Sequence, residues 1–204
     1  MAKHRGALWL NSLTTLSEGA AEALAQNEVQ LCLNGLTTLS EGAARALARH
    51  KGEQLILDGL TTLSEEVARA LGGHCGYLSL NGLTTLSDEA ARVLAGHRDC
   101  LSLDGVTTLS DKAAWALAGN KGDLKLNGLT TLSDEAARVL AGHNGCLELD
   151  GVTTLSYAAI RVLGIHKGDL GLDGLATFPE NSEAAEEAAR GLARHEGSPD
   201  DALR

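Results

Sequence analysis

Aromatic residues are scarce in this chain of 204 residues, which contains two tryptophans, two tyrosines and one phenylalanine. A globular enzyme of this size normally fills part of its core with aromatic rings, each of which buries about 150–250 Å². Hydrophobic residues nevertheless make up 44% of the sequence. The core is therefore expected to consist mainly of leucine, alanine and valine.

Positive charge is also scarce. The chain has 17 Lys+Arg against 27 Asp+Glu, and its net charge is −10. Half of this charge lies near the C-terminus, because residues 170–204 contain eight acidic residues and three arginines, which sum to −5. Proteins that bind phosphate backbones or anionic membranes usually carry the opposite charge. We therefore expect no nucleic-acid partner and no membrane partner.

Long hydrophobic runs are missing as well. No segment approaches the ~18–20 consecutive apolar residues of a membrane span, and the first ten residues lack the apolar stretch of a secretory signal. The chain is also long and leucine-rich enough to fold without a disulfide framework. We expect a cytoplasmic protein with reduced thiols at Cys32, Cys75, Cys100 and Cys146.

The main feature that is present is an internal repeat. Residues 78–100 read LSLNGLTTLSDEAARVLAGHRDC, and residues 124–146 differ from them at only three of 23 positions. Such a period indicates a solenoid, in which neighbouring units bury a continuous core. Units begin every 23 residues, with one extra residue between the second and third, at Leu8, Leu31, Leu55, Leu78, Leu101, Leu124, Leu147 and Leu170.

Within each unit the spacing of hydrophobic residues changes once, from the alternation of a strand to the spacing of a helix. The initial Leu-x-Leu predicts a short, half-buried strand, and Asn-Gly or Asp-Gly ends it. Ser followed by an acidic residue then predicts a helix N-cap. About ten helical residues should follow, with Ala90, Ala91, Leu94 and His97 on one face of the fourth helix. Glycines near the helix ends predict left-handed stops at Gly96, Gly119 and Gly142.

These positions resemble the leucine-rich repeat family. The pattern L-x-L-[ND]-G-[LV]-T-T-L-S-[DE]-x-A-A-x-x-L is most similar to the cysteine-containing subtype, L-x-L-x-x-C-x-x-I-T-D-x-G-L-x-x-L. Leu83, Val106 and Leu129 occupy the Cys position, and Leu86 occupies the Ile position. The resemblance covers roughly residues 8–195. It implies an α/β fold: a right-handed leucine-rich-repeat solenoid, or horseshoe, with a concave parallel β-sheet and short convex α-helices.

The repeat boundaries predict the organisation of the chain. A lead of residues 1–7 precedes the repeats at 8–177, whose eighth strand begins at residue 170. Pro179 then breaks the pattern, and we expect a capping helix within 178–195 and a flexible tail at 196–204. At the other end Leu8-Trp9-Leu10 should form a bare edge strand, which is a template for pairing with another chain.

Stacking turns each repeat position into a column of side chains. Two columns vary while the others are nearly constant: the residue before the first leucine and the residue between the two leucines, both expected on the concave face. We interpret them as the partner-binding surface, although drift on a solvated surface would also produce this variation. The candidate contact residues are Trp9, Ile56, Tyr77, Asp123, Lys125, Glu148 and Asp169.

The Asn/Asp column after the second leucine has two interpretations. A calcium ladder would need six to eight oxygens per ion, but carboxylates in alternate repeats lie about 10 Å apart. We favour a hydrogen bond from each side chain to the backbone of its own turn. The column consists of Asn11, Asn34, Asp58, Asn81, Asp104, Asn127, Asp150 and Asp173.

A histidine column lies three residues after the helical leucine. Neighbouring histidines could share Zn²⁺, but structural zinc usually has four ligands with Cys among them, and Asn27 and Asn120 occupy the same column. We therefore favour a structural ladder that hydrogen-bonds backbone groups, and we expect neither metal nor cofactor. Its histidines are His50, His74, His97, His143, His166 and His195.

Convex positions predict a solvated helical surface. Trp115 replaces an arginine there and should be exposed. One Thr of each Thr-Thr pair is expected to face inward, which argues against a flat ice-binding or polymer-binding array. The i, i+4 ion pairs expected on this side are Glu41–Arg45, Glu65–Arg69, Asp88–Arg92 and Asp134–Arg138.

Nothing in the sequence predicts an enzyme. No nucleophile is combined with an oriented base, no phosphate-binding glycine motif is present, and the repeated serines occupy helix caps. We expect a non-catalytic protein- or peptide-binding scaffold that uses the concave sheet. The alternative is a structural, self-associating solenoid, such as a homodimer, that pairs through its exposed N-terminal repeat.

Overall fold

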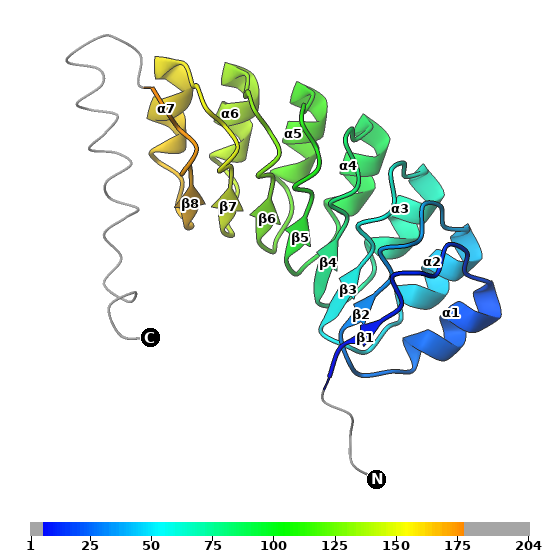
Figure 1. The fold of residues 1–204 in the computed structure, drawn as a ribbon. Helices are drawn as coiled ribbons and strands as arrows, with labels where there is room; N and C mark the ends of the chain where they lie inside the picture. Colours follow the sequence, from blue (N-terminus) through cyan, green and yellow to red (C-terminus); the bar gives the residue numbers. More distant parts are fainter. Residues whose placement is uncertain (1–5, 178–204) are drawn as a thin grey trace.

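The computed structural model describes residues 6–177 and shows eight parallel strands in one sheet, in chain order from β1 to β8. Seven helices alternate with these strands. The strands line the inner side of an open arc and the helices form its outer side (Figure 1). The predicted α/β solenoid with a concave parallel sheet is confirmed. The expected capping helix (178–195) and tail (196–204) lie outside the described residues.

Every strand is short. The strands are β1 (Leu8–Trp9), β2 (Leu31–Cys32), β3 (Gln54–Ile56), β4 (Tyr77–Ser79), β5 (Leu101–Ser102), β6 (Leu124–Lys125), β7 (Leu147–Glu148) and β8 (Leu170–Gly171). The helices are α1 (Glu18–Ala25), α2 (Glu41–Leu47), α3 (Glu65–Leu71), α4 (Asp88–Leu94), α5 (Asp111–Leu117), α6 (Asp134–Leu140) and α7 (Tyr157–Leu163). In this part of the chain no helix has the length and hydropathy to cross a bilayer.

Strand pairing keeps the leucines in register. The first leucine of each unit pairs with the first leucine of the next, from Leu8 with Leu31 to Leu147 with Leu170. The extra residue of the second unit lies between His50 and Leu55, so the loop absorbs it and Leu31 still pairs with Leu55. The 23-residue period thus determines both strand order and register.

Each helix begins at the serine that the sequence predicts. Ser87, for example, has an extended backbone and its Oγ accepts a hydrogen bond from the backbone N–H of Ala90 at 3.1 Å. All seven helices have the same cap. The serine oxygen satisfies a donor that has no partner within the helix, which explains why serine occurs at this position in each of the first seven units.

Helix ends differ from the prediction. The helices have seven or eight residues rather than about ten, and among the described residues only Gly76 has a positive φ, of 115°. The left-handed stops predicted at Gly96, Gly119 and Gly142 are wrong. Each helix ends instead in a tighter turn, as when the N–H of His97 donates to the oxygen of Leu94 at 2.9 Å.

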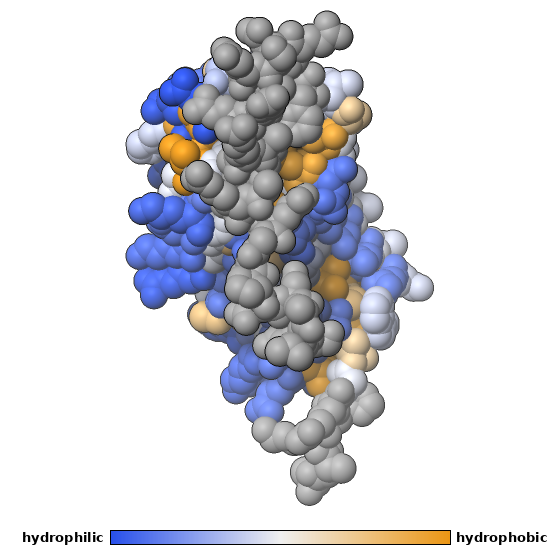
Figure 2. All heavy atoms as spheres, turned by 90° about the vertical axis from the view of Figure 1, so that its left-hand side faces the viewer, coloured by the Kyte–Doolittle hydropathy of each residue, from blue (hydrophilic) through white to orange (hydrophobic). Residues whose placement is uncertain are grey.

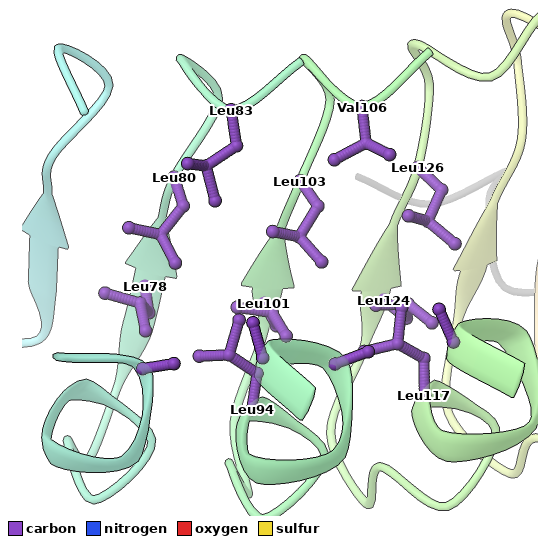
Figure 3. Close-up of a cluster of buried hydrophobic side chains, with 14 of the residues drawn as sticks. Leu78, Leu80, Leu83, Leu94, Leu101, Leu103, Val106, Leu117, Leu124 and Leu126 are labelled. Atoms are coloured by element: carbon purple, nitrogen blue, oxygen red, sulfur yellow. The ribbon is translucent and has the colours of Figure 1, made fainter. Parts of the chain in front are cut away.

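The core is a thin layer between sheet and helices. Two strand leucines, the leucine or valine after the glycine, and a helical leucine pack together in each unit (Figure 3). Buried alanines such as Ala90 and Ala91 let the helix approach the sheet closely. No aromatic residue within 6–177 is buried, which confirms the predicted composition of the core.

The glycines of the Asn-Gly and Asp-Gly pairs are required because a side chain would clash with the preceding unit, and not because their backbone has a positive φ. A Cβ at Gly105 would lie 2.0 Å from the backbone oxygen of Asn81 in the preceding unit. The equivalent glycines of the other units meet a preceding carbonyl at 1.9–2.3 Å. Only a residue without a side chain permits this approach between neighbouring backbones.

We predict that Gly105→Ala destabilises the protein by about 2–3 kcal/mol, because the new methyl group must push two units apart. Urea unfolding followed by circular dichroism measures the effect. Gly19→Ala is the matched control, since nothing lies within 4 Å of its Cβ position and the site is helical. The control should gain about 0.5–1 kcal/mol; equal stability of both variants would contradict the steric explanation.

Candidate functional site

The candidate contact residues lie along the inner side of the sheet, on a strand or directly before one. Trp9 of β1 is 62% exposed. Ile56 of β3 and Tyr77 of β4 are partly buried, whereas Asp123 and Asp169, which precede β6 and β8, are exposed. Since the strands follow chain order, the apolar candidates lie toward one end of the sheet and the charged candidates toward the other.

The structure brings two of the candidates into direct contact. Lys125 Nζ lies 2.6 Å from Glu148 Oε1, and Asn127 Nδ2 donates to Glu148 Oε2 at 2.9 Å. The hydrogen bond to Glu148 raises the pKa of Lys125. Burial alone would raise the pKa of Glu148, but the hydrogen bonds from Lys125 and Asn127 outweigh it and lower that pKa. Both side chains are therefore charged and held in place at neutral pH.

Part of the column between the leucines is not available to a partner. Cys32, Ser79 and Ser102 are buried, which differs from the expectation of a uniformly open column. Ser79 Oγ donates to Asp58 Oδ1 at 2.5 Å, and Ser102 Oγ donates to Asn81 Oδ1 at 2.8 Å. Each serine side chain bonds to the Asn/Asp column of the preceding unit and is buried there. The repeat pattern places serine in an outward-facing column, so the sequence alone did not predict this burial.

Two thiols flank Asp123 in the column before the first leucine. The pKa of Cys100 and that of Cys146 are each raised to about 11, chiefly by burial and further by nearby carboxylates that include Asp123 and Glu148. Thiols with such pKa values stay protonated at neutral pH and are poor nucleophiles. This region therefore offers polar contacts rather than reactive groups.

The Asn/Asp column forms a ladder between units, and the predicted hydrogen bond within each turn is wrong. Asn81 Oδ1 accepts from the backbone N–H of Asp104, the corresponding residue of the next unit, at 2.8 Å. Seven such bonds of 2.8–3.2 Å run from Asn11 to Asp173. Only an acceptor oxygen is needed, which explains why Asn and Asp alternate. Within residues 6–177 no three His, Cys, Asp or Glu side chains are grouped to hold a metal ion.

The histidine column is buried, with exposed fractions of 0–4%. His50 Nε2 lies 2.8 Å from the Val29 oxygen, and His166 Nε2 lies 3.1 Å from the Gly145 oxygen. At His74, His97 and His143 neither ring nitrogen reaches a partner with hydrogen-bonding geometry. The predicted contacts to backbone groups are therefore confirmed at some positions only, and His195 lies outside the described residues.

The stacked arrangement of these histidines is unsuited to binding one metal ion between them. The ring centroids of His50 and His74 are 6.1 Å apart, and those of His74 and His97 are 6.3 Å apart, with nearly parallel planes. Ligand nitrogens of one zinc ion each lie about 2.0–2.1 Å from the metal, a distance that parallel rings at this separation do not reach. The column is instead a stack of imidazoles.

The convex face is confirmed in part. Glu41 pairs with Arg45 at 2.5 Å, and Glu65 pairs with Arg69. The other two pairs predicted are wrong: Arg92 contacts Glu65, and Arg138 contacts Glu135, in place of Asp88 and Asp134. These short aspartates accept instead from the cap serines of the following units, Ser110 and Ser156.

Two further convex predictions have opposite outcomes. Trp115 is 72% exposed on α5, as expected. Both threonines of every Thr-Thr pair are exposed, so the prediction that one of them faces inward is wrong. The following leucine, such as Leu86, turns toward the core in their place. Viewed from the end that carries α7 and β8, the described surface is largely hydrophilic, with separate hydrophobic patches (Figure 2).

Comparison with models of known protein families gives no match for this chain, and no curated protein matches it. The function must therefore be argued from the geometry of the inner face.

We predict that Asp104→Ala lowers the free energy of unfolding by about 1–3 kcal/mol, because it removes acceptors for two hydrogen bonds. Asp104 Oδ1 accepts from the Asn127 N–H at 2.9 Å, and Oδ2 lies 2.9 Å from Ser102 Oγ, whose one hydrogen it shares with Asn81 Oδ1. Asp104→Asn keeps the first acceptor and should cost less than about 1 kcal/mol. Chemical denaturation compares the two variants, and an equal loss in both would disprove the ladder's contribution.

Proposed function

We propose that the protein is a non-catalytic, cytoplasmic leucine-rich-repeat scaffold that binds a protein or peptide on the inner face of its sheet. The repeat pattern, most similar to the cysteine-containing subtype, and the parallel strand contributed by each unit support this class. One observation carries the binding proposal: the columns that vary most between units belong to the strands of a single sheet, and among residues 6–177 the helices all lie on its other, outer side (Figure 1).

The charge on this face indicates the chemistry of the partner. In the column before the first leucine, the column between the two leucines and the Asn/Asp column, the units of β1–β4 contain one acidic residue, Asp58, and no basic residue, giving −1. The same columns in β5–β8 hold six acidic residues and Lys125, giving −5. A partner should therefore be positively charged where it crosses β5–β8 and less polar where it crosses β1–β4. The six acidic residues are Asp104, Asp123, Glu148, Asp150, Asp169 and Asp173.

The proposal involves no catalytic step and no cofactor. The repeated serines accept hydrogen bonds at helix caps, and the raised pKa values of Cys100 and Cys146 keep their thiols protonated.

We predict that Asp123→Lys/Asp169→Lys reduces binding of the partner at least about tenfold, because it replaces attraction with repulsion at two exposed sites. Affinity capture from cell extract followed by quantitative mass spectrometry measures the loss. Glu22→Lys/Glu89→Lys makes the same change in net charge at exposed helical positions and should leave capture unchanged. A comparable loss in both double variants would argue against the inner face.

Self-association is the second candidate function, and the exposure of β1 supports it. Within the described residues β1 pairs only with β2, so its other edge has free backbone groups. Trp9 on this strand is 62% exposed. An edge strand with an exposed aromatic side chain is suited to pairing with a second copy.

If β1 mediates self-association, Trp9→Lys should abolish any concentration-dependent increase in size, because a charge on an edge strand disfavours pairing. Sedimentation velocity over a range of concentrations tests this. Trp115→Lys is the control, since Trp115 is 72% exposed but lies on α5. A protein that remains monomeric at all concentrations would exclude this function.

A further inference from the structure

The buried histidines form two stacks rather than one continuous column. His50, His74 and His97 follow α2, α3 and α4 and stack on one another. His143 and His166 follow α6 and α7 and form the second stack, with centroids 6.2 Å apart. Asn120 lies between the stacks; its Nδ2 donates to the His97 oxygen at 2.9 Å, and its Oδ1 accepts from the Gly122 N–H at 2.8 Å. A side chain that does not titrate therefore separates the two groups.

The surroundings of the first stack offer little compensation for positive charge. His74 faces His50 on one side and His97 on the other, with the backbone of Ala48 nearby. The backbone of Gly76, Cys100 and Gly72 favours protonation of His97, as the backbone of Ala48 does for His74, but burial is the larger effect on both rings and lowers their pKa. Asp99 is the carboxylate that acts on both rings, but it is exposed and its Oδ2 already accepts from the Gly76 N–H at 2.9 Å.

The second stack is shorter, with two histidines in place of three. Burial and the charge of His166 oppose protonation of His143, whereas the backbone of Ala118 and Gly122 and the carboxylate of Asp123 favour it. His166 lies 3.1 Å from the Gly145 oxygen and 3.3 Å from the Ala141 oxygen. Fewer imidazoles therefore repel one another in this half when the pH falls.

We propose that the His50–His74–His97 stack is an acid-sensitive joint: its protonation opens the units around α2–α4, while Asn120 confines the opening to that side of the solenoid. A protonated ring in the middle of the stack would lie 6.1 and 6.3 Å from two others, and neither of its nitrogens makes a hydrogen bond in the closed state. Opening releases the rings to water. Solenoid units contact only their neighbours, so one part can open without the rest.

The direction of the pH effect follows from the pKa values. Burial, reinforced by His97 and His50, lowers the pKa of His74 to about 4, and burial also lowers the pKa of His50 and of His97. The closed state is fully favoured above the unfolded pKa of about 6.5 and loses stability as the pH falls toward the folded value. For His74 alone, opening should become about 30-fold more favourable between pH 7.5 and pH 5.

Opening has a consequence for binding that rests on the proposed function. β3 and β4 carry Ile56 and Tyr77, so their separation would remove the less polar half of the inner face. The joint itself is tested without a partner, and its failure would leave the binding proposal intact.

Hydrogen exchange with mass spectrometry on the full chain tests the joint at pH 7.5 and pH 5, after correction for intrinsic exchange rates. Amides of α2–α4 should lose protection at least about tenfold more than those of α6 and α7. His74→Asn, which copies the residue found at 120, should remove most of this difference. Asn120→His joins the stacks and should extend the acid-induced loss to α6 and α7.

The ratio of protection between the two pH values is the readout, so a variant with altered stability at neutral pH remains informative. His166→Asn is the control, because it changes the second stack and should leave the response of α2–α4 intact. Equal loss on both sides of Asn120 in the natural protein, or an unchanged response in His74→Asn, would overturn the proposal.

Discussion

Close backbone contact between neighbouring units is the constraint on which the rest of the structure depends. At Gly105 even a methyl group would lie 2.0 Å from the preceding carbonyl. Directly beside it, Asn81 Oδ1 accepts the Asp104 N–H at 2.8 Å. Strands of two or three residues supply few ladder bonds, so the glycine contact and the Asn/Asp bond must fix the spacing of the units. Each unit completes the hydrogen bonding of its neighbour, and none is complete alone.

This constraint also separates structural positions from those free to vary. Side chains that face the next unit are nearly constant because a change there affects two units at once. Residues on the inner face are less restricted, although not uniformly so: Ser79 and Ser102 bond to the ladder, while Lys125 and Glu148 bond to each other. Asp123 is exposed, but its Oδ1 accepts from the Cys146 N–H of the next unit at 2.9 Å. The exposed carboxylate of Asp169 makes no such bond within the described residues, so it is the freer of the two to contact a partner.

The sequence predicts well the features that are determined within a single repeat unit. It predicts less well the contacts that form between two neighbouring units. Strand starts, register and serine caps follow from the repeat itself, and all agree with the structure. The partner of Asn81 and that of Asp88 depend on the distance to the next unit, which no pattern within a unit specifies. The left-handed helix stop predicted at Gly96 was wrong for a related reason. A glycine near a helix end often adopts a positive φ, but here the helix ends in a tight turn in which Gly96 does not have one.

Asn120 shows that hydrogen bonding does not explain the histidine column. Its amide satisfies two backbone groups at once, whereas His74, His97 and His143 satisfy none with their ring nitrogens. Asparagine is therefore the better residue for bonding at this position. Histidine contributes bulk: its ring fills the space between a helix end and the next strand and stacks on its neighbours at 6.1–6.3 Å. Packing that relies on neutral imidazole holds only while the rings stay unprotonated, so the choice of histidine over asparagine links the integrity of the solenoid to pH.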